Sequence, residues 1–186
     1  MIAAIVLAAG QATRFGRCKQ LMPLAGKPLL QHVLDNLRQS KIEDVVVVLG
    51  AHAEEIREGI RFERERVVFN ADFAQGMSTS IQAGLRALSE GTEATMIVLA
   101  DQPYVNAQTF DALIDAYRQL RTPIVVPTYG GKRGNPVVVD RSLFAEMMEL
   151  RGDVGFRALF GNREMAKVAV ADRGVVIDID SPGDLE

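Results

Sequence analysis

The chain has 186 residues, of which 48% are hydrophobic and 24% charged, and its formal net charge at pH 7 is -3. This length and apolar content suffice for one sizeable core, so we expect a single domain over residues 1–186. The negative net charge argues against broad nucleic-acid binding. No apolar run reaches the ~20 residues of a membrane span, and the N-terminus lacks the features of a secretory signal. We therefore expect a cytoplasmic protein that acts on small anionic molecules and binds neither nucleic acid nor membrane.

The first segment of the chain opens with an apolar run and continues into a loop of small and basic residues. The β-branched residues of the run predict a buried strand over residues 2–8. Gly10 and Gly16 then allow peptide N–H groups to converge on phosphate oxygens, while Arg14 and Lys19 supply positive charge. The spacing matches neither a P-loop nor a dinucleotide fingerprint. We therefore predict a different phosphate-binding loop, with bare backbone for a base or ribose at Ala8, Ala9 and Gly10.

Beyond this loop, apolar runs alternate mostly with helical patterns. Further strands are predicted over residues 44–49, 66–69, 95–100, 124–127, 136–139 and 166–170. Helices are predicted over residues 28–39, 78–89, 106–120 and 142–149. The run at 44–49 has no polar alternation, which is typical of a central parallel strand covered on both faces. The pattern predicts an α/β protein with three α/β/α layers and a doubly wound, mostly parallel sheet, and residues 129–132 predict a small hairpin excursion from it.

Three aspartates are candidate metal ligands. Asp101 follows the predicted strand at 95–100, and ligands of doubly wound sheets collect beyond the carboxyl ends of strands. Its carboxylate can therefore bind Mg²⁺ that bridges to triphosphate oxygens, although a cap of the turn before Pro103 is the alternative. Asp178 and Asp180 alternate with isoleucines, so both would face one side of an extended segment. We expect Asp178 rather than Asp180 to reach the metal, with Asp180 as the alternative.

A helix start is predicted at the GMSTS segment, which begins at Gly76. Its hydroxyl groups and free N–H groups suit a ribose or the edge of a base. An ordinary capped helix explains the pattern equally well. On the functional interpretation, Gly76, Ser78 and Ser80 bind the nucleotide.

Two later segments are candidates for contact with an acceptor molecule. Asn135 and Pro136 are explained either by a tight turn or by acceptor contact, with the predicted hairpin as a neighbouring wall. Gly152 and Asp153 predict a helix start with an acidic cap. Arg157 in the same segment either binds an acceptor phosphate or lies on a solvated helix face.

The pattern LAAG-x-x-x-R-x-G-x-x-K-x-L-x-P-x-x-G-K-P-L-L at residues 7–30 resembles the signature of the MobA-like nucleotidyltransferases, and most closely their molybdenum cofactor cytidylyltransferase branch. Further matching segments follow in the expected order: GMSTSIQAGL, LADQP, GNPVV, RGDVGFR and DIDSPGDL. The resemblance implies a Rossmann-like nucleotidyltransferase fold, magnesium on Asp101 near the DIDSP segment, and a pterin acceptor near residues 152–157. It also implies nucleotide binding by Leu7, Ala8, Ala9, Gly10, Arg14, Lys19, Gly76, Ser78 and Ser80.

The reaction implied is attack by a terminal phosphate of the acceptor on the α-phosphorus of a nucleoside triphosphate, which releases pyrophosphate. Such transfers depend on in-line positioning and neutralised charge, so we assign Lys19 to the transition state, Arg14 to the triphosphate and Asp101 to Mg²⁺. Family members with Ala-Gly at the end of the first strand tend to use CTP, and Ala9 and Gly10 match them.

The acceptor would then be Mo-molybdopterin, the product molybdopterin cytosine dinucleotide, and the recipient a molybdenum hydroxylase. Three alternatives stay open: a related enzyme that uses GTP, one that uses a sugar or alcohol phosphate as acceptor, and a non-catalytic carrier of the molybdenum cofactor.

Overall fold

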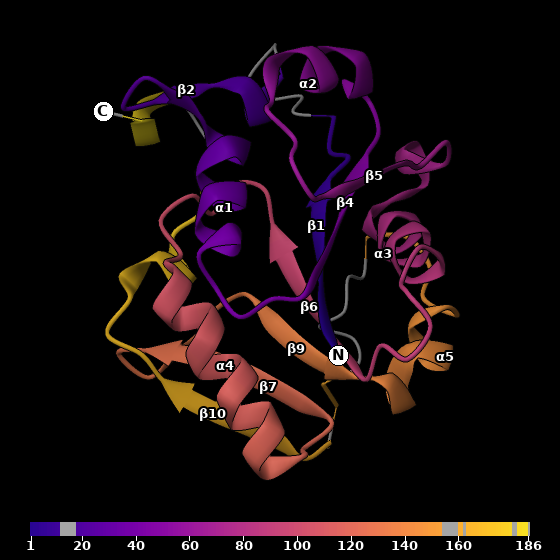
Figure 1. Cartoon of the computed structure of the whole chain (residues 1–186), viewed down its shortest axis with the longest axis vertical. Helices are drawn as coiled ribbons and strands as arrows, with labels where there is room; N and C mark the ends of the chain where they lie inside the picture. Colours follow the sequence, from indigo (N-terminus) through magenta and orange to yellow (C-terminus); the bar gives the residue numbers. More distant parts are fainter. Residues whose placement is uncertain (12–17, 154–159, 162, 180–181, 186) are drawn as a thin grey trace.

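The computed structural model describes the whole chain except residues 12–17, 154–159, 162, 180–181 and 186 (Figure 1). Its main sheet has the strand order β10-β7-β9-β6-β1-β4-β5, with β8 paired to β7. These strands are β1 (Ile2–Ala8), β4 (Asp44–Leu49), β5 (Arg66–Phe69), β6 (Ala94–Leu99), β7 (Ile124–Tyr129), β8 (Lys132–Arg133), β9 (Val137–Asp140) and β10 (Met165–Ala169). A separate two-stranded ribbon pairs β2 (Pro23–Leu24) with β3 (Lys27–Pro28).

The helices cover both faces of the main sheet, with α1 and α4 on one side and α3 and α5 on the other (Figure 1). The five α-helices are α1 (Leu29–Arg38), α2 (Ala53–Gly59), α3 (Met77–Arg86), α4 (Ala107–Leu120) and α5 (Phe144–Met147) among the described residues. Short 3₁₀ turns include η1 (Lys19–Leu21), η2 (Phe73–Gln75), η3 (Arg141–Leu143), η5 (Arg173–Val176) and η6 (Pro182–Leu185).

The alternation of side chains along the strands produces two separate cores. Val45 and Val47 of β4 pack in the core beneath α1, α2 and α4, whereas Val46 and Val48 pack in the core beneath α3 and α5. Successive residues of a strand point to opposite faces, so a strand that is covered on both faces must be apolar throughout. The predicted three-layer fold and its mostly parallel sheet are therefore confirmed.

The sheet has a switch in strand order at β1. This strand pairs in parallel with β4 on one side and with β6 on the other. In such sheets the crevice beyond the carboxyl ends of the strands, at the switch, is the usual place for a ligand. Because Leu7 of β1 is in register with Leu99 of β6, the loops that follow Ala8 and Leu99 leave the sheet side by side.

The hairpin excursion is also confirmed. β7 and β8 are antiparallel and are joined by Gly130 and Gly131, whose φ angles are 53° and 78°. Two consecutive left-handed residues form the two-residue turn that fits the twist of a hairpin, and glycine adopts that conformation without steric cost.

Two helices differ from the prediction. α2 was not among the predicted helices, because its only buried side chains are Ala53 and Ile56 and such a short stripe carries no clear period. The helix predicted over residues 142–149 begins as the 3₁₀ turn η3, where Asp140 accepts a hydrogen bond from the N–H of Ser142, and is α-helical only over α5. In the part of the chain that the structure describes, none of the helices is long and apolar enough to span a membrane.

Candidate nucleotide and metal site

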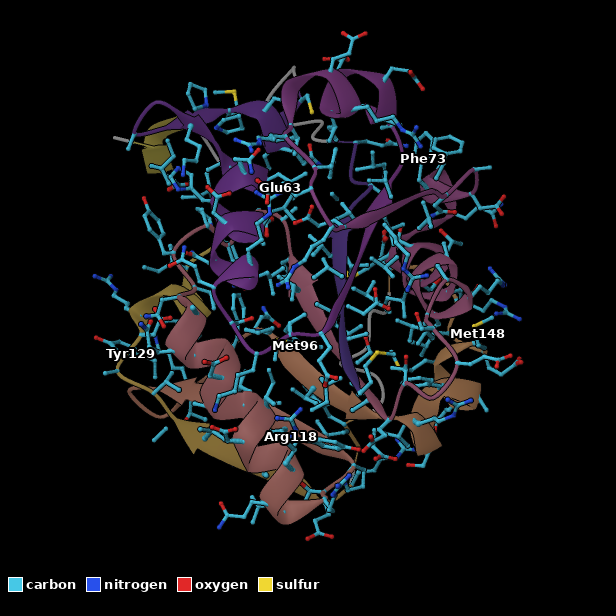
Figure 2. The ribbon with its side chains drawn as sticks, viewed as in Figure 1. Glu63, Phe73, Met96, Arg118, Tyr129 and Met148 are labelled. Carbon is cyan, nitrogen blue, oxygen red and sulfur yellow. The ribbon has the colours of Figure 1, made fainter. Side chains whose placement is uncertain are left out.

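A cavity of about 450 Å³ lies at the switch point, beyond the carboxyl ends of β1 and β6. Its walls come from β1 and the following loop, η1, η2 with the start of α3, the end of β6, and the segment before residue 154. Figure 2 shows Phe73 of this wall at the upper right of the molecule. The wall includes eight of the predicted site residues: Leu7, Ala9, Gly10, Lys19, Gly76, Ser80, Asp101 and Asp153.

Lys19 and Asp101 meet in this cavity although 82 residues separate them in the chain. Lys19 Nζ donates to Asp101 Oδ2 at 2.9 Å, and the two side chains are 15% and 31% exposed. The other carboxylate oxygen, Asp101 Oδ1, is buried and accepts no hydrogen bond from any described residue. A buried acceptor without a partner is unusual in a folded protein and is often explained by an ion or water.

A second aspartate lies beside Asp101. The N–H of Ile179 donates to the backbone oxygen of Asp101 at 3.0 Å, and Gln102 Nε2 donates to Asp178 Oδ1 at 2.6 Å. Asp178 is exposed. Asp180 lies outside the described residues.

This donor set fits a divalent cation. Mg²⁺ is usually held by one or two carboxylates together with substrate phosphates and water. The residues that the structure describes contain no group of three or more His, Cys, Asp or Glu that could hold a metal. Among the described residues, Asp101 and Asp178 offer two carboxylates, which is the donor number typical of a metal that the substrate helps to bind.

Two buried glutamines, which the sequence analysis did not single out, organise the site. Gln20 Nε2 donates to the oxygen of Ala8 at 3.0 Å, which ties η1 and its Lys19 to the end of β1. Gln20 Oε1 accepts from Cys18 Sγ at 3.3 Å, and burial raises the pKa of the Cys18 thiol. The Gln102 side chain likewise donates a hydrogen bond, in this case to the carboxylate of Asp178. Each glutamine directly follows a charged residue of the site in the sequence. This position was the one sequence feature that could have identified the two glutamines as site residues.

The start of α3 corrects one expectation. Met77 N donates to Asp153 Oδ1 at 3.1 Å, and Ser78 N donates to the oxygen of Gly152 at 3.1 Å. The N–H groups of these two residues are therefore not free, because the 152–153 segment already caps the helix. The start of α3 packs closely against this segment. Gly76 has a φ angle of 109°, and a Cβ atom there would lie 2.5 Å from the carbonyl carbon of Gly152.

The remaining predicted residues are distributed outside this cavity. Ala8 is buried at the end of β1, and Ser78 and Gly152 line a separate polar cavity. Ser80, which does line the main cavity, accepts a hydrogen bond at its Oγ from Asn70 Nδ2 at 3.0 Å. Asn135 and Pro136 do not line the main cavity, and Asn135 N donates to the oxygen of Val175 at 2.9 Å. Arg14 and Arg157 lie outside the described residues.

Comparison with known proteins places this arrangement in a family. The MobA-like NTP transferase domain matches residues 4–168, which contain the loop, Lys19 and Asp101. The chain belongs to the MobA-like NTP transferase family.

The names of the relatives of this MobA-like protein refer to different activities. It is 31% identical over 168 residues to Nicotine blue oxidoreductase of Paenarthrobacter nicotinovorans, covering 84% of this chain and 79% of that protein. It is 35% identical over 118 residues to the Bifunctional protein GlmU of Symbiobacterium thermophilum, which is 62% of this chain but only 25% of GlmU. The chain thus spans about a quarter of the length of GlmU.

A solved structure adds a metal to the comparison. The manganese complex of Rv0371C from Mycobacterium tuberculosis is 30% identical to this MobA-like chain, with a TM-score of 0.85 and coverage of 98% of this chain and 95% of that one.

Proposed function

We propose that this MobA-like protein transfers CMP from CTP to the terminal phosphate of Mo-molybdopterin, forming molybdopterin cytosine dinucleotide and releasing pyrophosphate. The observation that carries the proposal is the cavity in which the small-residue end of β1 meets the Lys19–Asp101 pair. A non-catalytic carrier of the cofactor has no need for such a pair beside a nucleotide-sized cavity.

The base is read at the end of β1. Ala9 is 6% exposed and lies against Gly50, where a Cβ would come within 2.7 Å of the Ala9 oxygen and of Phe73 Cβ. Gly50 and Phe73 pack against Ala9, and the Gln20 side chain holds the Ala8 oxygen, so the small-residue end of β1 offers a rigid surface to a base. Ala9 and Gly10 match the Ala-Gly pair of the cytidylyl members that the sequence resembles, which favours CTP over GTP, and a single methyl group in such a pocket can change base preference.

The triphosphate lies along the floor of the cavity, toward Asp101. Lys19 Nζ, held in place by η1 and Gln20, supplies positive charge and N–H donors where charge develops on the phosphates. Arg14 supplies a second positive charge. Asp101 and Asp178 would hold Mg²⁺, which would neutralise charge on the triphosphate. The manganese complex of the mycobacterial relative supports a divalent ion in this family.

The domain, the location and the partners are part of the same proposal. Residues 1–186 act as one nucleotidyltransferase domain in the cytoplasm. CTP and Mo-molybdopterin are the substrates, and a molybdenum hydroxylase receives the product.

Pyrophosphate release tests the proposal. The purified protein is assayed with Mg²⁺ and CTP, GTP or ATP, each with and without Mo-molybdopterin, and separately with sugar phosphates. We expect release only with CTP and the pterin together. Release with GTP or with a sugar phosphate would contradict the proposal in favour of a related transferase, and tight pterin binding without release would indicate a carrier.

The same preparation is also assayed for oxidation of NADH and NADPH, because one relative is named as an oxidoreductase. Turnover of a nicotinamide cofactor without pyrophosphate release would overturn the proposal.

A further inference from the structure

A third cavity lies beside the hairpin that β7 and β8 form. Its volume is about 280 Å³, and it is lined by Tyr129, Gly130, Lys132, Arg173, Val176 and Ile177. Figure 2 shows Tyr129 at the left edge of the molecule, on the opposite flank from Phe73 of the nucleotide cavity. The cavity thus offers an aromatic ring, two aliphatic side chains and two cations.

The Lys132 ammonium group is available to a ligand. Successive residues of a strand point to opposite faces. Arg133 lies against the Phe160 ring, with its guanidinium carbon 5.3 Å from the ring centre. Lys132 lines the cavity instead, and its ammonium group makes no hydrogen bond or ion pair with a described residue.

The Arg173 guanidinium is also without a partner among the described residues, although the turn that carries it is firmly anchored. Asp172 accepts hydrogen bonds from Asn106 N at 2.9 Å, from Thr109 Oγ1 at 2.8 Å and from Gly174 N at 2.8 Å. Gly174 and Val175 are buried. A rigid turn that presents an unpaired arginine beside an aromatic ring is suited to binding an external group.

The cavity is connected to the proposed metal site through one short segment. Ile177 lines the cavity, Asp178 bonds to Gln102, and Ile179 N bonds to the Asp101 oxygen. Two residues of extended chain span about 7 Å. A molecule of cofactor size can therefore place one end in the cavity and the other beside Asp101.

From this juxtaposition we infer that the hairpin cavity binds the planar heterocycle of the acceptor, with Tyr129 against the ring face and Lys132 and Arg173 on acceptor atoms or negative charge at its edge. The inference rests on the proposed function, because it concerns the acceptor of that reaction. Arginine and tyrosine are suited to this role, since a guanidinium stacks on and donates to planar rings and a phenol ring packs against them.

Fluorescence anisotropy with pterin-6-carboxylate tests the inference, because this probe is a planar, anionic and fluorescent heterocycle. We expect the wild-type protein to bind it, and Arg173→Gln and Lys132→Gln each to weaken binding at least about tenfold through loss of a charge-assisted hydrogen bond. Arg118→Gln is the matched control, because Arg118 is an exposed cation on α4 that pairs with Glu43. It should leave the affinity unchanged.

Two further measurements separate the possible outcomes. Calorimetry with CTP and Mg²⁺ should give the same affinity for the wild type and for the two variants, since neither residue lines the nucleotide cavity. Benzoate at equal concentration should fail to displace the probe. Failure of the probe to bind, equal binding by the variants, or displacement by benzoate would overturn the inference, whereas failure of CTP binding would instead count against the proposed function.

Discussion

At the scale of single residues, Lys19 is the side chain whose loss should affect turnover most. Lys19→Ala removes the ammonium group that points at Asp101, and we expect kcat to fall by about a hundredfold or more, as on loss of one preorganised charge donor. The circular dichroism spectrum should stay unchanged. Pyrophosphate release under saturating substrate measures the effect.

Lys41→Ala is the control for Lys19→Ala. Lys41 is a surface lysine that pairs with Asp115 and lies outside the nucleotide cavity. Near-normal turnover of the Lys19 variant, or an equal loss in both variants, would remove Lys19 from its proposed role.

The residues of the site differ in how well sequence could predict them. Lys19 and Asp101 were recognisable because each is a charged residue directly after an apolar run or in a small-residue loop. Gln20 and Gln102 follow these residues directly, but the sequence does not show which distant group an amide side chain will contact. Their partners, the Ala8 oxygen and Asp178, are 12 and 76 residues away in the chain.

At the scale of elements, one buried ion pair joins α1 to the start of β5. Arg38 Nε and Nη2 donate to the two carboxylate oxygens of Glu65, whose side chain is 1% exposed. Burial by itself would raise the pKa of this carboxyl, but the hydrogen bonds from Arg38 and from the backbone hold it below its usual value of 4.5.

The direction of this shift determines a pH dependence. A pKa that is lower in the folded than in the unfolded protein adds stability above the unfolded pKa, and this stability is lost as pH falls through the folded pKa. We expect the free energy of unfolding to decrease below about pH 4.5, partly through Glu65. Glu65→Gln should lower the free energy of unfolding by about 1.5–3 kcal/mol at pH 7. It should also make this free energy fall less steeply as the pH decreases.

Urea unfolding at several pH values measures both effects. Glu58→Gln serves as the control, because Glu58 is exposed on α2. If the free energy of unfolding falls as steeply at low pH in the Glu65 variant as in the wild type, other carboxyl groups account for the acid destabilisation.

At the scale of the whole molecule, the cavity at the switch point, which is the proposed nucleotide site, draws its walls from segments spread between Leu7 and Asp153. A ligand bound there connects all of them, so it should stabilise the entire fold. CTP with Mg²⁺ at a hundred times its Kd should add about 2.7 kcal/mol, which corresponds to a rise in Tm of roughly 5–10 °C for a chain of this size.

Differential scanning calorimetry tests this coupling. In Asp101→Asn, the part of the rise that depends on Mg²⁺ should disappear, while Asp115→Asn on the surface of α4 should behave like the wild type. A rise that is independent of Mg²⁺ in both the wild type and Asp101→Asn would contradict the assignment of Asp101 as a metal ligand.

The sequence by itself determined the alternation of strands and helices, because apolar periodicity is a local property that shows how many faces of each element are buried. It also placed Lys19 in the loop that follows β1 and Asp101 just after the end of β6. Only the tertiary structure decided that Asp153 caps α3, that Gln20 and Gln102 orient the site, and that Lys132 and Arg173 meet at one cavity. These contacts join residues far apart in the chain, and their partners depend on strand order and register, which no local pattern records.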